Sequence, residues 1–288
     1  MHITFFDILS YIESKEPEEV VITTNGTLIN KTHANILNSY KKTKTTVQVS
    51  LDSIDENEHN LIRGSSTAYQ KAINGVHILV NSNIFTSIRA TISPSQLNQM
   101  ELIIKKAIDL GAKRIGLSTI VPVGRANKLD ETLFFAKENK RKFIQNFLYL
   151  REKYNSQIEV VTHEPQKACF ELSHNCKDKD NQIIFGGCTA GVGQINMENN
   201  GDITPCALMA IPITNIINKT IDEAKNDYKN SLLIKNLIMN NYKGKCGICN
   251  FKDMCGGCRA IPFGLHDDPL AEDETCFMNN SQSNSVLL

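Results

Sequence analysis

The residues most able to bind a metal or to react are the cysteines, all nine of which follow residue 168. Four of them form a run in which the intervals are two, five and two residues: Cys246, Cys249, Cys255 and Cys258. This spacing brings several thiolates to one point and is typical of a metal site. Three more complete the set: Cys188, Cys206 and Cys276. Seven sulfurs are enough for more than one iron–sulfur cluster.

Two other uses of so many cysteines compete with this interpretation. A disulfide framework fits poorly, because the count is odd, the chain has 288 residues and the N-terminus lacks a signal core. Zinc is the better alternative, because cysteines two residues apart are common zinc ligands. The knuckles of a zinc ribbon are usually separated by a long hairpin, whereas here five residues lie between them. The pattern favours iron–sulfur ligation, zinc stays open, and such thiolates indicate a reducing cytoplasm.

Composition limits the partners. Lys plus Arg equals Asp plus Glu at 31 each, so net charge gives no reason to expect a nucleic acid or a membrane surface as partner. Hydrophobic residues make up 41% of the chain, as in ordinary globular proteins, and no apolar run is long enough to span a bilayer. We therefore expect a cytoplasmic protein with no membrane segment.

The first half of the chain must supply the elements that position a site. Short β-branched runs predict strands at 20–24, 46–51, 85–92 and 114–121. Between the second and third strands, apolar residues recur at three- and four-residue steps and predict a helix: Tyr69, Ala72, Ile73, Val76, Leu79 and Val80. Strands and helices that alternate with short connections predict an α/β fold with a parallel sheet.

A polar residue follows each of these strands. Asn25 follows the first strand and Asp52 the second, whereas Ser93 and Thr119 mark the ends of the third and fourth. Any one of them is explained by turn formation alone. Because the carboxyl ends of parallel strands form the usual ligand edge of α/β folds, the four together predict a site.

Several motifs on these elements resemble the middle strands of a radical S-adenosylmethionine (SAM) enzyme: Thr24-Asn25-Gly26-Thr27-Leu28, Ser50-Leu51-Asp52-Ser53, Arg63-Gly64 and Pro122-Val123-Gly124-Arg125-Ala126. The cysteine pattern is similar to the seven-cysteine SPASM module, which carries auxiliary [4Fe–4S] clusters in many of these enzymes. The last interval is two residues here, where the family often has three. The resemblance implies a partial (β/α)6 barrel at 1–126, a connecting helix and strand at 127–168, and a small Cys-rich SPASM domain at 169–288.

One part of the family pattern is missing. Radical SAM enzymes ligate their catalytic cluster with three cysteines after the first barrel strand, but residues 1–168 contain no cysteine. The sequence resembles the family from a later helix onwards, at Phe5-Phe6-Asp7-Ile8-Leu9. We therefore expect a barrel that lacks its first two strands and exposes the 20–24 strand as an edge. The full-length parent is expected to be an oxidoreductase or maturase, and the 288-residue chain alone to be inactive.

The resemblance also implies residues that bind SAM. Ser50 matches the family serine that hydrogen-bonds the SAM ribose, and Arg63 matches the arginine that meets the SAM carboxylate. Asn25 and Asp52 are expected to position the same ligand. In the family, SAM cleavage gives a 5′-deoxyadenosyl radical that abstracts hydrogen from a substrate carbon. No catalytic residue is assigned from the sequence.

Carried over from the family, the ligand sets divide the cysteines between two auxiliary clusters. The first set is Cys188, Cys206 and Cys258, and the second is Cys246, Cys249, Cys255 and Cys276. Cys258 thus leaves its local run to serve the other cluster. An eighth ligand is expected at Cys176 or Cys169, the alternative being an iron that is open to substrate.

The residues around the cysteines narrow the substrate class. Gly244–Cys249, Cys255–Ala260 and Leu270–Asp273 resemble enzymes of the alternative heme and heme d1 pathways, which modify tetrapyrrole side chains. Enzymes that modify ribosomal peptides are the first alternative. A non-catalytic iron–sulfur fragment for electron transfer or substrate binding is the second. The expected partners are therefore a tetrapyrrole or peptide substrate and a reductant such as ferredoxin or flavodoxin.

Overall fold

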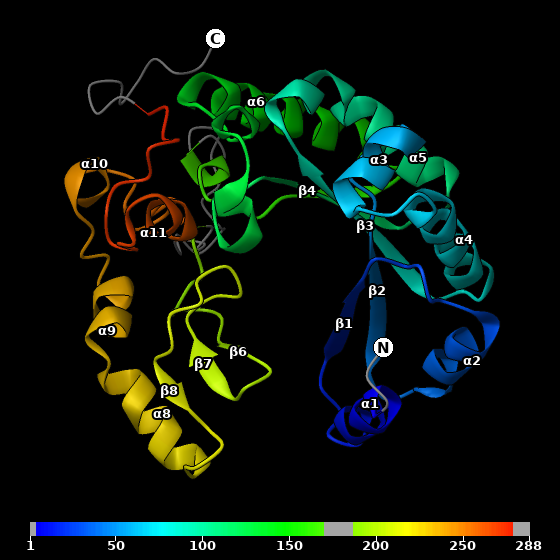
Figure 1. Cartoon of the computed structure of the whole chain (residues 1–288), viewed down its shortest axis with the longest axis horizontal. Coiled ribbons are helices and arrows are strands. Elements are labelled where there is room, and N and C mark those ends of the chain that lie inside the picture. Colours follow the sequence, from blue (N-terminus) through cyan, green and yellow to red (C-terminus); the bar gives the residue numbers. More distant parts are fainter. Residues whose placement is uncertain (1–3, 170–186, 279–288) are drawn as a thin grey trace. The chain divides into compact units, whose positions relative to one another are not determined.

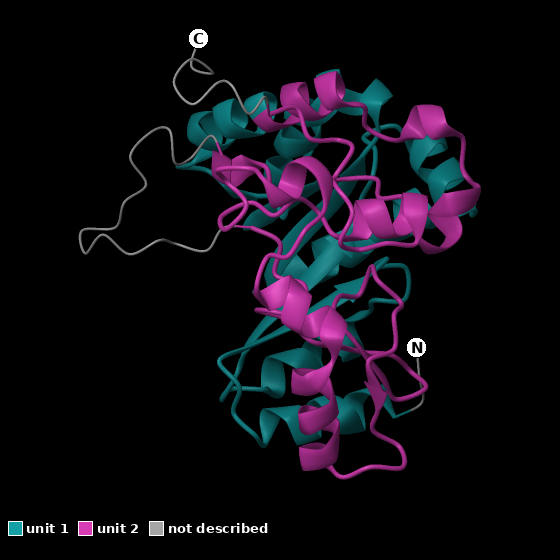
Figure 2. Ribbon diagram, turned by 90° about the vertical axis from the view of Figure 1, so that its left-hand side faces the viewer, with its two compact units in different colours: residues 1–118, 145–163 teal, residues 119–144, 164–288 magenta. Residues whose placement is uncertain are grey.

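The computed structural model describes residues 4–169 and 187–278. It contains two compact units, which Figure 2 colours separately. Unit 1 comprises residues 1–118 and 145–163, and unit 2 comprises residues 119–144 and 164–288. The predicted ligand Cys176 lies outside the described residues, and the predicted division at residues 126 and 168 stays a prediction.

Unit 1 is built on a five-stranded sheet with the order β1-β2-β3-β4-β5 (Figure 1). Its strands are β1 (Glu19–Thr24), β2 (Lys44–Ser50), β3 (Phe85–Ile92), β4 (Arg114–Thr119) and β5 (Glu159–Val161). The pairs β1–β2, β2–β3 and β4–β5 are parallel. The sequence prediction of an α/β fold is therefore confirmed, and each predicted strand lies within two residues of an observed one.

Helices connect these strands: α1 (Phe5–Glu13), α2 (Lys31–Ser39), α3 (Glu56–Arg63), α4 (Ala68–Asn81), α5 (Met100–Asp109) and α6 (Lys137–Tyr154). Short 3-10 turns are η1 (Pro94–Gln99), η2 (Gly124–Lys128) and η3 (Glu131–Leu133). Helix α4 packs on β2 and β3. Its apolar face is buried with Ala72, Val76 and Leu79, as the periodicity predicts. This packing fixes the loops at the carboxyl ends of the strands.

A close approach sets the first of these loops. Gly26 follows Asn25 with a φ of +78°, a left-handed conformation that favours glycine. A Cβ atom at Gly75 of α4 would lie 2.4 Å from the carbonyl oxygen of Gly26. The two glycines therefore let the turn after β1 rest directly on α4.

Unit 2 holds a three-stranded antiparallel sheet in the order β6 (Asn196–Met197), β7 (Asp202–Thr204) and β8 (Thr214–Asn215). Four helices follow: α8 (Ile221–Asn230), α9 (Leu232–Ile238), α10 (Gly244–Gly247) and α11 (Ala260–His266). Helix α8 begins at a capping box formed by Thr220 and Glu223. Across the described residues, the helices are too short or too polar to cross a membrane.

Candidate functional site

Three of the predicted metal ligands meet in one apolar cluster of unit 2. Cys188, Cys206 and Cys258 pack against the buried side chains of Ala190, Met209 and Ala260. The backbone N–H of Leu208 donates to Cys206 Sγ at 3.4 Å. This set is called the first sulfur group.

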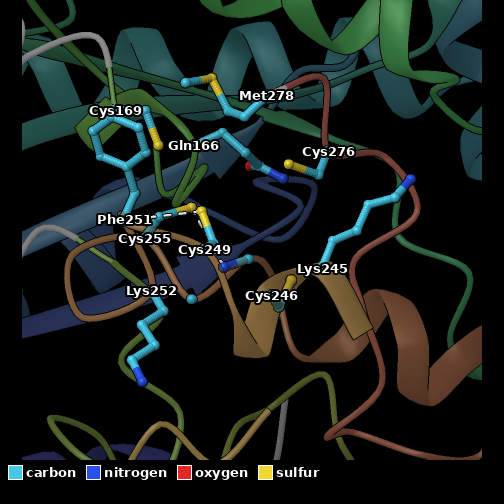
Figure 3. Close-up of a pocket in the computed structure, with 12 residues that line it drawn as sticks. Gln166, Cys169, Lys245, Cys246, Cys249, Phe251, Lys252, Cys255, Cys276 and Met278 are labelled. Atoms are coloured by element: carbon cyan, nitrogen blue, oxygen red, sulfur yellow. Dashed lines mark hydrogen bonds between the residues drawn. The ribbon is translucent and has the colours of Figure 1, made fainter. Parts of the chain in front are cut away.

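The four other predicted ligands that the structure describes line one pocket of unit 2, which Figure 3 shows: Cys246, Cys249, Cys255 and Cys276. Three of these sulfurs accept backbone N–H groups at 3.4 Å, from Asp273 to Cys246, from Phe251 to Cys249 and from Gly257 to Cys255. Amide donors aimed at sulfur suit ligands that carry negative charge. These four cysteines are called the second sulfur group.

A glycine pair separates Cys255 from Cys258, which belong to different groups. Gly256 and Gly257 have φ values of 64° and 67°, and this left-handed turn favours glycine. A Cβ atom at Gly257 would lie 2.7 Å from Asp273 Cβ, so the second glycine also allows a close approach. The residues that line the pocket accordingly include Cys255 but not Cys258. The expected crossing of Cys258 is compatible with this turn, and the ligand sets themselves stay a prediction.

Cys169 lies with the second sulfur group. It lines the same pocket and is buried, and its side chain interacts with that of Cys255. The family assignment names Cys169 or Cys176 as the extra ligand of the first cluster. In the structure Cys169 lies beside the second sulfur group, and the choice between the two stays a prediction.

The pKa is raised at six of these thiols, namely Cys206, Cys246, Cys249, Cys255, Cys258 and Cys276. Burial raises the pKa of Cys206, Cys246 and Cys249, and it raises the pKa of Cys276 to about 12. Burial followed by the neighbouring Cys188 raises the pKa of Cys258. Seven buried or half-buried sulfurs in two glycine-rich sites are the donor set that iron–sulfur clusters use. These residues therefore fit the clusters that the sequence predicts.

No three His, Cys, Asp or Glu side chains within residues 4–169 and 187–278 form a group that could hold a single metal ion. A [4Fe–4S] cluster needs a different spacing of its ligands, because each ligand binds a different iron. Its cysteines therefore stand farther apart than the ligands around one ion.

In unit 1, two of the predicted SAM-binding residues form an ion pair. Arg63 Nη2 lies 2.5 Å from Asp52 Oδ2, and the Asp52 side chain is 4% exposed against 31% for Arg63. Asp52 Oδ1 also accepts the backbone N–H of Thr91 at 3.1 Å. Asp52 is therefore held by the protein itself, and it orients the more exposed guanidinium of Arg63.

The strand register places the other two predicted residues at the same edge. Thr24 pairs with Val49, so Asn25 follows β1 where Ser50 ends β2. Ser50 in turn pairs with Arg89 of β3. Asn25 Oδ1 accepts the backbone N–H and the hydroxyl of Thr27. Asn25 also lines a cavity of about 380 Å³ between α1, β1 and α2, whose other residues are mostly apolar.

Buried side chains support the loop that carries Asp52. His59 is 1% exposed, and its Nδ1 accepts the backbone N–H of Asp52 at 3.2 Å. Burial lowers the pKa of His59, so the ring is neutral as this hydrogen bond requires. Gln96 Nε2 donates to the carbonyl oxygen of Asp52 at 2.9 Å.

The sequence analysis missed a buried ion pair in unit 2. Lys140 of α6 is fully buried, and its Nζ lies 2.5 Å from Glu164 Oε2 and 2.7 Å from Thr119 Oγ1. Burial alone raises the pKa of Glu164, but Lys140 and Thr119 outweigh this effect and hold the pKa below its usual value. Lys140 lies in a polar stretch, Lys137–Lys142, so the sequence carries no signal of its burial.

Comparison with known proteins bears on what these sites do. No protein-family model matches the chain. The AdoMet-dependent heme synthase of Nitratidesulfovibrio vulgaris is 25% identical over 280 residues, which cover 94% of this chain and 74% of that protein. AlbA, a subtilosin biosynthesis protein of Bacillus subtilis, is 24% identical over 257 residues, 88% of this chain and 52% of AlbA. The homologues of this chain are radical SAM/SPASM enzymes.

One further relative and two solved structures are also similar to this chain. The pre-heme d1 synthase of Dinoroseobacter shibae is 26% identical over 255 residues, 83% of this chain and 63% of that protein. The structure of anSMEcpe with bound AdoMet has a TM-score of 0.69 at 18% identity and covers 95% of this chain and 75% of that one. Streptococcus suis SuiB bound to its precursor peptide SuiA has a TM-score of 0.72 at 19% identity, over 96% and 62%. The chain therefore has the radical SAM/SPASM fold.

Proposed function

We propose that this chain belongs to a radical SAM/SPASM enzyme that holds two auxiliary [4Fe–4S] clusters and modifies the side chain of a tetrapyrrole. The observation that carries the proposal is the sorting of seven buried or half-buried cysteines into two groups within unit 2. The heme synthase and pre-heme d1 synthase relatives supply the substrate class.

In unit 2, the chain provides sulfur ligands and donors to them. Cys188, Cys206 and Cys258 are assigned to the first cluster, and the second sulfur group to the second. When bound, the clusters supply one-electron transfer. The backbone N–H groups that already point at the sulfurs stabilise their negative charge, and the apolar cluster around the first group keeps water away.

In unit 1, the chain provides a binding edge for SAM. When bound, SAM supplies the means of abstracting hydrogen from a substrate carbon. Arg63 offers a guanidinium to the SAM carboxylate, and Asp52 fixes that guanidinium from behind. Ser50 offers a hydroxyl to the ribose, and Asn25 completes the same edge of the sheet.

A second candidate function is the maturation of a ribosomal peptide. AlbA is a bacteriocin biosynthesis protein, and SuiB has been solved with a precursor peptide. Direct binding assays separate the two substrate classes: the tetrapyrrole proposal predicts that a porphyrin such as coproporphyrin III quenches intrinsic tyrosine fluorescence saturably. Saturable binding of a leader-bearing peptide, without porphyrin binding, favours the peptide function instead.

Iron and sulfide analysis of three proteins tests the cluster assignment. We expect about eight irons per chain after anaerobic reconstitution, as two clusters of four. Cys258→Ala is expected to disturb the cluster at Cys188 and Cys206, whereas Cys246→Ala is expected to disturb only the other one. Stoichiometric zinc without sulfide in anaerobically purified protein contradicts the proposal.

The proposal also includes an electron donor and a cellular compartment. The reductant is a small one-electron protein such as ferredoxin or flavodoxin, and no nucleic acid takes part. The thiolate-rich sites require a reducing compartment, so the cytoplasm is the proposed location.

A further inference from the structure

Arg259 is a buried cation beside the second sulfur group. It directly follows Cys258, and its side chain is fully buried. Nη1 donates to the carbonyl oxygens of Pro269 at 3.2 Å and Ala271 at 2.7 Å, and Nη2 donates to Cys246 Sγ at 3.5 Å. The guanidinium also stacks over the ring of Tyr242, 4.4 Å from its centroid.

Among residues 4–169 and 187–278, Arg259 has no carboxylate within ion-pair distance, and its buried Nε has no hydrogen-bond acceptor. Asp268 acts on the guanidinium only through space, because Arg259 is among the causes that lower the pKa of Asp268. A buried cation is costly unless an anion compensates it. In the described part of the chain the only sulfur to which it donates is Cys246 Sγ, so a bound cluster with its thiolate ligands would bring the compensating negative charge to this place.

Asp273 links the same sulfur to the first group. Its side chain is buried, and its backbone N–H donates to Cys246 Sγ at 3.4 Å. Asp273 Oδ2 accepts the backbone N–H of Cys258 at 2.9 Å. It also accepts Gln166 Nε2 at 2.7 Å, while Oδ1 accepts the N–H and hydroxyl of Thr275. Asp273 thereby bonds to both groups, its carboxylate to the backbone of Cys258 and its backbone N–H to the sulfur of Cys246.

We propose that Arg259 and Asp273 form an electrostatic bridge that sets the reduction potentials of the two clusters, with Arg259 acting mainly on the second and Asp273 on both. The inference rests on the proposed function, since it requires that the clusters bind. Reduction adds negative charge to a cluster. The Arg259 cation therefore raises the potential of the second cluster, and the Asp273 carboxylate lowers the potential of both. Both are positioning residues, because each acts through a ligand.

Electron paramagnetic resonance during a redox titration measures these potentials. We expect Arg259→Met to make reduction of the second cluster at least tenfold less favourable, which is about 59 mV for a one-electron couple. Asp273→Asn is expected to move both potentials the opposite way. The same titration in a Cys206→Ala background, where the proposed function leaves only the second cluster, assigns the signal.

Lys219→Met is the matched control. It also removes one positive charge from unit 2, but Lys219 pairs with Asp227 and forms no bond to any cysteine that the structure describes. Its potentials should equal those of the unaltered protein. If Arg259→Met loses its iron, Arg259→Lys and Asp273→Asn replace it in the test. Arg259→Lys keeps the positive charge, so the reduction potential of the second cluster should stay close to that of the unaltered protein, whereas Asp273→Asn should raise both potentials. Unchanged potentials in Arg259→Met, or a shift as large in Lys219→Met, overturn the inference. Absence of clusters from the unaltered protein refutes the proposed function instead.

Discussion

Replacement of Lys140 by methionine tests how far unit 2 depends on its buried ion pair. The Lys140 side chain is 0% exposed and that of Glu164 is 8% exposed, so neither charge has water as a substitute partner. Methionine fills a similar volume but removes the cation that lies against the buried Glu164 carboxylate. Breaking a buried pair from one side costs about 3–5 kcal/mol. With an m-value of about 3 kcal/mol/M, the urea midpoint falls by about 1–1.7 M.

Anaerobic urea unfolding followed by far-UV circular dichroism measures this shift. The double variant Lys140→Met/Glu164→Gln removes both charges and is expected to lose less than Lys140→Met alone, because the buried carboxylate is neutralised together with its cation. The control is Lys42→Met, which removes an exposed lysine that pairs with Glu16 and should leave the midpoint unchanged.

The pH dependence of the effect follows from Glu164. Its pKa is lowered in the folded protein, so its contribution is fully present above its unfolded pKa of about 4.3 and is lost as pH falls through the folded pKa. The difference between the unaltered protein and Glu164→Gln should therefore shrink on acidification. A midpoint for Lys140→Met equal to that of Lys42→Met at neutral pH contradicts the whole argument.

Three further outcomes are expected. Iron uptake by the apoprotein should strengthen as pH rises, since burial raises the pKa of Cys246 and of Cys276 and binding requires thiolates; pH-independent uptake in a titration with iron and sulfide contradicts this. The unaltered protein should lose stability below about pH 6.5, the unfolded pKa of histidine, because His59 stays neutral when folded, and His59→Asn should reduce that loss in urea unfolding. The 288-residue chain alone should form no 5′-deoxyadenosine from SAM, because residues 1–168 contain no cysteine to ligate a catalytic cluster; detection of the product by chromatography counts against the proposed architecture.

Local patterns in the sequence determined the class of fold and the kind of chemistry. The strands and the buried face of α4 follow from periodicities that span a few residues, which is why their predicted positions agree with the structure. The cysteine intervals, likewise short, indicated iron–sulfur ligation without any knowledge of the fold. The homologues confirm the resemblance to radical SAM/SPASM enzymes. That resemblance indicated which residues at the strand ends are candidates for binding SAM.

Tertiary structure decided which side chains face one another. Cys169 joins Cys255 although 86 positions separate them in the chain, and no interval in the sequence distinguishes one sulfur group from the other. Arg259 and Lys140 read as ordinary surface cations, and only packing shows that each is fully buried. The physical reason is that burial and charge pairing depend on segments brought together by folding, whereas the preferences that a sequence pattern reports act over a few neighbouring residues.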